Sequence, residues 1–186
     1  MADLVLATER LDLRPVSEAD LSWLLAEMNT PAVMRHLGGP RSEQAVRESL
    51  AADLAALADA TYIRWTIWHR DAQCRVRRTG LFHVRSPAAP GGLRGQREVG
   101  WSLASAHEGH GYATEAARAV LAYAFETAGC EAVYAQASDN NGPSTRMMAR
   151  LGLTRVPEFD YDDPEYEPEE NPTRVYRVTR SQWSVQ

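Results

Sequence analysis

The chain has 186 residues, of which 44% are hydrophobic and 24% charged, and its formal net charge is −5. This length and composition fit one globular domain, residues 1–186, with a single substantial core. No run approaches the roughly 20 apolar residues that cross a bilayer, and the start lacks the basic stretch of a signal peptide, so we expect a cytoplasmic protein with no membrane contact.

The N-terminal third predicts one strand followed by two helices. Residues 11–16 alternate between apolar and polar side chains, as a half-buried strand does. Ser17 then begins a helix-capping pattern, and residues 21–28 place leucines and a methionine on one helical face. The Gly-Gly-Pro sequence at 38–40 interrupts the chain, and apolar residues recur at helical spacing over 46–57.

The middle of the chain predicts an antiparallel meander of three strands. Residues 62–69 are rich in aromatic and β-branched side chains, and residues 79–85 continue this pattern more weakly. The Arg-rich residues 71–78 between them are interpreted as the hairpin turn. After a Pro- and Gly-rich loop at 87–92, residues 98–103 form the third strand.

The C-terminal half alternates helices with strands. A long helix is expected over 114–127 and a shorter one over 143–150, with a strand at 132–137 between them. Two further strands follow at 153–156 and 174–179. A meander followed by a βαβ unit implies an α/β fold with one mixed, twisted sheet and helices on both of its faces.

An acidic segment, residues 158–170, separates the last two strands. It holds eight of the 25 acids within thirteen residues, which leaves 17 acids against 20 Arg in the rest of the chain, and there is no Lys. Such a composition is typical of a mobile, solvated loop. It repels nucleic acid, so we expect no nucleic-acid partner. A second interpretation is that this segment borders the substrate site and attracts a cationic substrate.

Metal and nucleophile motifs are not apparent. The two cysteines, Cys74 and Cys130, stand in no C-x-x-C pair, and the five His are scattered without metal-ligand spacing. No G-x-S-x-G nucleophile motif is present either. We therefore expect neither a metal nor a covalent enzyme intermediate.

A glycine-containing turn at residues 108–116 carries the strongest chemical signal. Glycines between a strand and a long helix expose successive N–H groups, and the start of the helix adds a partial positive charge, so the turn suits a pyrophosphate. The pattern is neither that of a P-loop nor that of a dinucleotide-binding fold. The alternative is that Gly109 and Gly111 only turn the chain.

Residues 98–116 resemble motif A of the GNAT acetyltransferases, in which Q/R-x-x-G-x-G/A opens the helix that holds the CoA pyrophosphate. Residues 141–144 together with 150–153 resemble motif B of that family. Residues 11–21 and the turn at 38–40 also resemble the RimJ/RimL-like branch, which acetylates protein N-termini, antibiotics and small amines. The resemblance covers most of the chain.

The resemblance implies the GNAT fold, with a largely antiparallel sheet whose strand at 98–103 splays from its neighbour at the CoA cleft. It implies acetyl-CoA as the cosubstrate and no metal. Glu108 departs from the family, which has Gln or Arg at that position, while the backbone cradle of the turn is retained. The residues implied in cofactor binding are Trp101, Leu103, Gly109, His110, Gly111, Tyr112, Ala113, Thr114 and Asn141.

Several of these side chains have a structural reading beside the functional one. Trp101 suits a core or groove-lining aromatic, and Tyr112 a packing residue beside the cradle. His110 is expected to offer its N–H group and to leave its ring in solvent. Asn141 fits either a bond to pantetheine or a turn.

Acetyl transfer to an amine needs a base, because the amine arrives largely as an ammonium ion, and a proton for the leaving thiolate. Glu98 begins the splayed strand and, by resemblance to RimL-like enzymes, is the candidate base, directly or through water. Ser144 is the candidate that protonates the thiolate. The alternatives are a solvated strand-edge carboxylate for Glu98 and helix capping for Ser144.

The sequence therefore predicts an acetyl-CoA-dependent N-acetyltransferase that acts through a ternary complex. The acceptor is expected to be a primary amine, either a protein N-terminus or a small cationic amine. A homodimer is compatible with the sequence. The alternative function is a non-catalytic acyl-CoA-binding sensor or interaction module.

Overall fold

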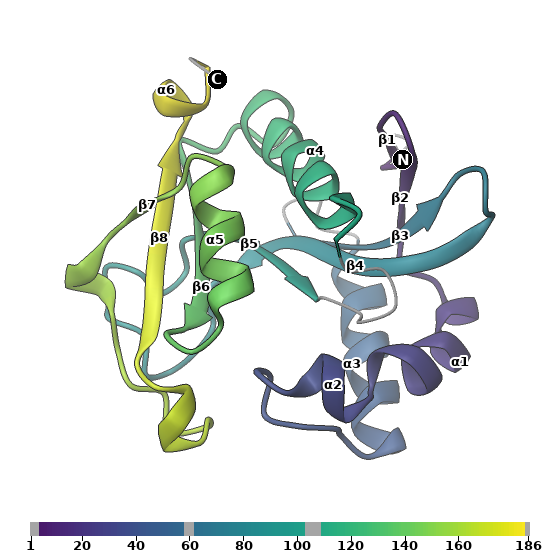
Figure 1. The fold of residues 1–186 in the computed structure, drawn as a ribbon, viewed down its shortest axis with the longest axis horizontal. Coiled ribbons are helices and arrows are strands. Elements are labelled where there is room, and N and C mark those ends of the chain that lie inside the picture. Colours follow the sequence, from purple (N-terminus) through teal and green to yellow (C-terminus); the bar gives the residue numbers. More distant parts are fainter. Residues whose placement is uncertain (1–3, 58–61, 103–108, 185–186) are drawn as a thin grey trace.

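An eight-stranded sheet runs through the computed structural model, which describes residues 4–57, 62–102 and 109–184 (Figure 1). The strand order is β1-β2-β3-β4-β5-β6-β8-β7, and every neighbouring pair is antiparallel except β5 with β6. The strands are β1 (Leu6–Ala7), β2 (Leu11–Pro15), β3 (Ile63–His69), β4 (Cys74–His83), β5 (Arg97–Ser102), β6 (Ala132–Ser138), β7 (Thr154–Arg155) and β8 (Thr173–Thr179).

Helices cover both faces of the sheet, as predicted. The N-terminal helices pack on one face, while the two helices that flank β6 in the sequence pack on the other (Figure 1). None of the helices in the described ranges is long and apolar enough to cross a membrane. The α-helices are α1 (Leu21–Trp23), α2 (Pro31–Met34), α3 (Glu43–Ala56), α4 (Tyr112–Glu126), α5 (Gly142–Arg150) and α6 (Arg180–Trp183).

The main core lies between the sheet and α4. Alternate residues of β3, among them Ile63, Trp65 and Ile67, are fully buried beneath this helix, because side chains along a strand alternate between its two faces. Four of the eight buried residues of α4 are alanines, whose small side chains allow a close approach to the sheet. The Trp65 ring meets the Tyr123 ring edge-on, with their centroids 5.6 Å apart.

The sheet opens between β5 and β6. These two parallel strands pair at a single position in the described chain, Glu98 opposite Tyr134. Beyond that pair, β5 stays bonded to β4 as far as Ser102, while β6 stays bonded to β8 as far as Ser138. The expected splay is thus present, and it begins at Glu98.

The prediction of an Arg-rich hairpin turn at 71–78 is wrong, because β4 already begins at Cys74. The arginines of this stretch face protein instead of solvent. Arg75 forms an ion pair with the buried Asp20 at 2.7 Å, and Arg78 forms one with the buried Asp53 at 2.8 Å. Carboxylates from the N-terminal helical region thus extend the strand through residues that look like a polar turn.

The helix expected over 21–28 is present, but it is not α-helical throughout. α1 passes at Leu24 into a π-helical turn, η2 (Leu24–Met28). Asn29 ends that turn, since its amide side chain makes two hydrogen bonds, of 2.7 and 2.8 Å, with the backbone of Arg41. α2 then begins at Pro31. β1, α2 and α6 had no counterpart among the predicted elements.

The acidic segment differs from the solvated loop expected over 158–170. It contains two short 3₁₀ turns, η4 (Pro157–Phe159) and η5 (Pro168–Glu170). Asp160 binds Arg155 and Arg174 at 2.6 and 2.9 Å, and its carboxylate also accepts from the backbone N–H of Val175. Asp163 is buried. Part of the acidic composition therefore serves to attach this segment to β8.

Candidate active site

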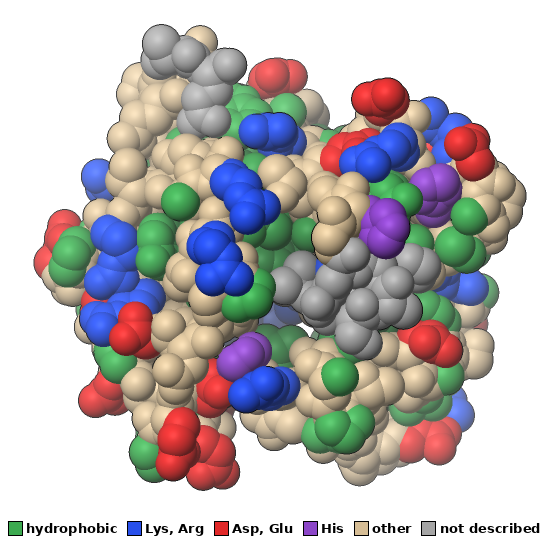
Figure 2. Space-filling model, in the orientation of Figure 1, with side chains coloured by type: hydrophobic (Ala, Val, Ile, Leu, Met, Phe, Trp, Pro, Cys, Tyr) green, Lys and Arg blue, Asp and Glu red, His purple; other side chains and the backbone are tan. Residues whose placement is uncertain are grey.

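A cleft of about 440 Å³ lies where β5 and β6 diverge, and the space-filling view shows the molecule hollowed near its centre (Figure 2). We call it the central cleft. Side chains from β3, β4, β5, β6 and α5 meet there with parts of the N-terminal helical region and the acidic segment. Its lining includes four residues singled out from the sequence, Glu98, Trp101, Asn141 and Ser144.

Glu98 lies at the point where the sheet opens. Its burial raises the pKa of the carboxyl from 4.5 to about 7, although a hydrogen bond from Gln136 and the nearby charge of Arg64 act in the opposite direction. Part of its side chain remains exposed to the cleft. A carboxylate with this pKa takes up and releases a proton near neutral pH, which suits a general base.

Gln136 connects Glu98 to the acidic segment. The Tyr161 hydroxyl donates to Gln136 Oε1 at 2.9 Å. Because that bond occupies the carbonyl end of the amide, the N–H₂ end is directed toward Glu98. Farther out, the Ser86 hydroxyl donates to the buried Asp163 at 2.7 Å. Glu98 is therefore held by long-range hydrogen bonding that was not foreseen from the sequence.

Ser144 and Asn141 have distinct roles at the start of α5. The Asn141 side chain caps the helix by accepting from the Ser144 N–H at 3.2 Å, a structural role that differs from the turn considered for it. Ser144 is buried, and its Oγ accepts a hydrogen bond from the Trp101 indole at 3.3 Å. A hydroxyl that accepts in this way keeps its own proton for donation into the cleft.

The glycine-containing turn precedes α4 as the sequence predicts, although the helix begins at Tyr112 instead of residue 114. Gly109 and Gly111 have φ values of 82° and 79°, in the left-handed region that favours glycine. Among the described residues, an added Cβ would find no atom within 4 Å at Gly109 and only an Arg10 nitrogen, at 3.6 Å, at Gly111. The described part of the chain therefore leaves space beside the start of a 15-residue helix, whose first N–H groups have no partner within the helix.

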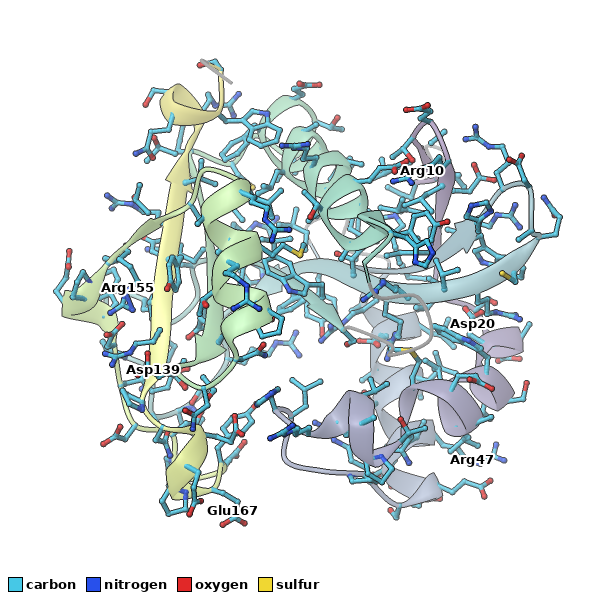
Figure 3. All side chains as sticks on the ribbon, viewed as in Figure 1. Arg10, Asp20, Arg47, Asp139, Arg155 and Glu167 are labelled. Atoms are coloured by element: carbon cyan, nitrogen blue, oxygen red, sulfur yellow. The ribbon has the colours of Figure 1, made fainter. Side chains whose placement is uncertain are left out.

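Side chains beside this turn form a small cluster around Tyr112. Its ring stacks on His110 at 5.5 Å and lies edge-on to His69 at 5.2 Å, so the packing role expected of Tyr112 is confirmed. The His110 ring is exposed as expected, but it rests on Tyr112. The guanidinium of Arg10 lies 4.7 Å from the centre of the Tyr112 ring (Figure 3).

Arg10 and Glu115 anchor the N-terminal strands to the first turn of α4. Glu115 accepts from the Thr8 hydroxyl at 2.6 Å and from the backbone and side chain of Arg10 at 3.0 and 2.8 Å. These bonds hold the pKa of Glu115 below its usual value in spite of partial burial. Arg10 thus places a cation beside the turn, which the sequence alone gave no reason to expect.

These features fit a CoA-type ligand. A helix start with open N–H groups suits a pyrophosphate, and the separated edges of β5 and β6 suit an extended arm that pairs with backbone. Leu103 and Glu108, two positions of interest in the sequence, lie outside the described residues. Among those that are described, no group of three His, Cys, Asp or Glu side chains could hold a metal ion.

One wall of the central cleft is rich in arginine. The guanidinium of Arg64 stacks on Phe82 at 4.2 Å, and that of Arg85 stacks on Tyr62 at 4.4 Å. Asp53, from α3, is a buried carboxylate on this wall. The sequence does not predict this wall, because its residues come from α3, β3 and β4, which are separate elements of the chain. The sequence also predicts a turn where the first arginines of β4 lie.

The two sides of the molecule are joined beside the cleft. His36, which follows α2, contacts Glu170 of η5 with 2.8 Å between Nδ1 and the carboxylate. Both residues also line the cleft. Glu165 and Tyr166 of the acidic segment line it as well, so that segment does border the cleft, although Asp160 lies with the structural pairs described above.

A sheet opened between parallel neighbours, a helix start suited to an anion and a half-buried carboxylate at the opening are the features expected of an acetyltransferase site. The chain belongs to the GNAT family, because the model of the acetyltransferase (GNAT) domain matches residues 10–154. An acetyltransferase from Agrobacterium tumefaciens has the same fold, with a TM-score of 0.78 and 30% identity over 96% of this chain and 95% of that one.

Other relatives agree with this assignment. The uncharacterized N-acetyltransferase YoaA of Bacillus subtilis is 27% identical over 155 residues, which are 81% of this chain and 83% of YoaA. RimL, a ribosomal L7/L12 alpha-N-protein acetyltransferase, shares the fold at a TM-score of 0.76, with 13% identity over 94% of this chain and 93% of RimL. The fold predicted from the sequence is therefore confirmed.

Proposed function

We propose that the protein transfers an acetyl group from acetyl-CoA to a primary amine by direct attack in a ternary complex. The observation that carries this proposal is the position of Glu98. Its carboxyl stands where β5 leaves β6, in the same cleft as Ser144, and its pKa is raised to about 7. A base is needed there because an amine arrives mainly as ammonium.

The donor side is assigned to the turn and the two splayed strands. Acetyl-CoA supplies the acetyl group as a thioester when bound. Residues 109–114 offer backbone N–H groups to its pyrophosphate, while the open edge of β5 at Trp101 and the start of α5 at Asn141 border its pantetheine arm.

The proton transfers are assigned to two side chains. Glu98 takes a proton from the ammonium group, directly or through water, so that the nitrogen lone pair forms the new N–C bond. As the C–S bond breaks, the Ser144 hydroxyl donates a proton to the sulfur. Ser144 is suited to this because its Oγ is held by Trp101 and is buried. Removal of one positioned acid or base lowers a rate by about 10²–10⁴-fold.

The acceptor is proposed to be a protein N-terminus or a small amine. RimL is named for the first of these, and it supports that option only through its fold. A cytoplasmic location and a possible homodimer belong to the same proposal.

Mass spectrometry of a cell extract incubated with the protein and labelled acetyl-CoA tests this function. We expect labelled acetyl groups on amines with the wild-type protein and at least a hundredfold fewer with Glu98→Gln. A protein that binds acetyl-CoA but yields no labelled product above the Glu98→Gln background would instead be a non-catalytic acyl-CoA-binding module.

A further inference from the structure

Two arginines on one wall of the central cleft share one carboxylate. Arg78 Nη2 lies 2.8 Å from Asp53 Oδ2, and Arg64 Nε lies 3.6 Å from Asp53 Oδ1. Asp53 is only 5% exposed, and the Tyr62 hydroxyl also donates to it, at 3.4 Å. Asp53 therefore neutralises one of the two guanidinium charges, while Asp20 and Glu98 also act on Arg78 and Arg64, respectively.

The second guanidinium charge is costly in its surroundings. Burial and the repulsion of Arg64 both lower the pKa of Arg78, while Asp53 raises it. The Nε atoms of Arg64 and Arg78 are buried and have no hydrogen-bond partner in the described chain. Buried charges and N–H donors are normally paired, so this cluster would stabilise an anion bound at the remaining guanidinium N–H groups.

Two further arginines lie at the more exposed part of the same cleft. Arg85 stacks on Tyr62, and Arg41 follows the turn that connects α2 to α3. Within the described residues, neither guanidinium has a carboxylate partner. Four arginines, Arg41, Arg64, Arg78 and Arg85, thus line the cleft.

The cluster also lies close to the proposed base. Arg64 is one of the charges that lower the pKa of Glu98. Once Glu98 has taken a proton from the acceptor, it is neutral and cannot balance Arg64. An anion bound at Arg64 would therefore be next to the reacting amine and would supply the missing charge.

We propose that the acceptor carries a carboxylate close to its amine and that Arg64, Arg78 and Arg85 bind this carboxylate. The inference rests on the proposed function and narrows it to small acceptors of the amino-acid type. A carboxylate fits because guanidinium groups bind it through paired N–H donors. Acids of the acidic segment that line the same cleft, such as Glu165, would complement the ammonium group of the same molecule.

A small acceptor also agrees with the size of the cleft. Its volume of about 440 Å³ must hold the acetyl end of the donor as well as the acceptor, and small-molecule sites commonly occupy about 300–1,000 Å³. The contact between His36 and Glu170 connects the N-terminal helical region to the acidic segment beside this space.

The test compares matched pairs of acceptors. Initial rates are measured for the twenty amino acids and for their carboxamides, which keep the amine and lose the anion, and for aminomethylphosphonate as a phosphonate probe. Wild-type protein should acetylate at least one amino acid with a kcat/KM at least tenfold above that of its amide. The phosphonate should be a poorer acceptor than the amino acid of equal length. A clear preference for the phosphonate would show that the arginines select a phosphonate-type anion and not a carboxylate.

Arginine variants test which side chains cause the preference for a carboxylate. Arg85→Gln and Arg64→Gln should reduce the preference for carboxylate over amide at least fivefold, mainly through KM. Arg47→Gln is the matched control, because Arg47 lies on the outer face of α3, pairs with Glu43 at 2.6 Å and does not line the cleft (Figure 3). It should keep the preference.

Binding of products gives a readout that does not depend on turnover. The N-acetyl amino acid should raise the melting temperature of wild-type protein more than its amide does, and Arg85→Gln should remove that difference.

Three results would overturn the inference. Amides acetylated as well as the acids would refute it and leave the proposed function intact. Arginine variants that move the pH profile of Glu98 without changing the acid-to-amide ratio would show that these side chains only tune the base. Acetyl-CoA binding without acetylation of any amine, in the panel or in a cell extract, would refute the proposed function itself.

Discussion

The indole nitrogen of Trp101 donates a hydrogen bond to the hydroxyl oxygen of Ser144 at 3.3 Å. The two residues belong to elements that border the opening in the sheet, β5 and α5. This bond fixes the position of the Ser144 oxygen on the side of the cleft where the donor is proposed to bind. It also uses one of the oxygen lone pairs, so the hydroxyl proton remains available to a leaving group.

Ser144→Ala should lower kcat by about 10²-fold or more, since the leaving thiolate then lacks a positioned acid. Affinity for CoA should stay within about twofold. Thr145→Ala is the control, because the Thr145 hydroxyl bonds the Gly142 carbonyl of the same helix at 3.0 Å and does not line the cleft. Wild-type kcat in Ser144→Ala, under conditions where chemistry limits the rate, would remove Ser144 from the mechanism.

Gly111→Val should weaken CoA binding at least tenfold, equivalent to about 1.4 kcal/mol. The substitution puts a branched side chain into the space before the N–H groups of α4 and strains a backbone with φ of 79°. Gly129→Val is the matched control, because Gly129 also has a positive φ, of 70°, but lies beyond the other end of α4. Calorimetric titration with CoA should separate the two variants. Equal affinity in both would place the pyrophosphate elsewhere.

The features that could be predicted from the sequence depend on short-range patterns. Glycine spacing and helix periodicity located the turn before α4 within two residues, since both are determined by neighbours in the chain. Motif resemblance selected Glu98, Trp101, Asn141 and Ser144, and the fold brings all four to one cleft. The sequence could not decide whether Ser144 caps α5. The structure shows that Asn141 is the cap and that Ser144 is buried.

The features that were missed depend on pairing between distant residues. The contacts of Asp53 with Arg78, Glu115 with Arg10, and Gln136 with Tyr161 span 25, 105 and 25 positions. Nothing in the local pattern of such residues indicates their partners. Asp160 illustrates the same point, because in sequence it is one more acid of an acidic segment, whereas in the fold it secures β8.

Tyr161→Phe should raise the pKa of Glu98 and shift the acidic limb of the kcat/KM profile to higher pH. Without the Tyr161 hydroxyl, the Gln136 amide loses the bond that orients its N–H₂ end toward Glu98. The ionised carboxylate is then less well stabilised. Tyr134→Phe is the control, as Tyr134 is buried on the same strand as Gln136. Coincident profiles for the wild type and Tyr161→Phe would limit Tyr161 to packing.

Glu98→Gln should stabilise the fold at high pH and not at low pH. The folded-state pKa of Glu98 is raised to about 7 from 4.5, so its contribution to stability is fully present below about pH 4.5 and is lost as the pH rises through 7. Glutamine does not ionise and escapes this loss. The difference in melting temperature, variant minus wild type, should therefore grow between pH 4.5 and 7 and then level off. A difference independent of pH would contradict the raised pKa.

The pH dependence of kcat/KM in wild-type protein and Glu98→Gln tests the central claim most directly. If ionised Glu98 deprotonates the bound ammonium, the wild-type value should fall tenfold per pH unit below a midpoint near 7. Glu98→Gln should be lower by about 10²–10⁴-fold at pH 8, and its remaining activity should follow only the fraction of neutral amine. A variant that keeps wild-type kcat/KM at pH 8, or the same midpoint near 7, would contradict the assignment of Glu98 as the base.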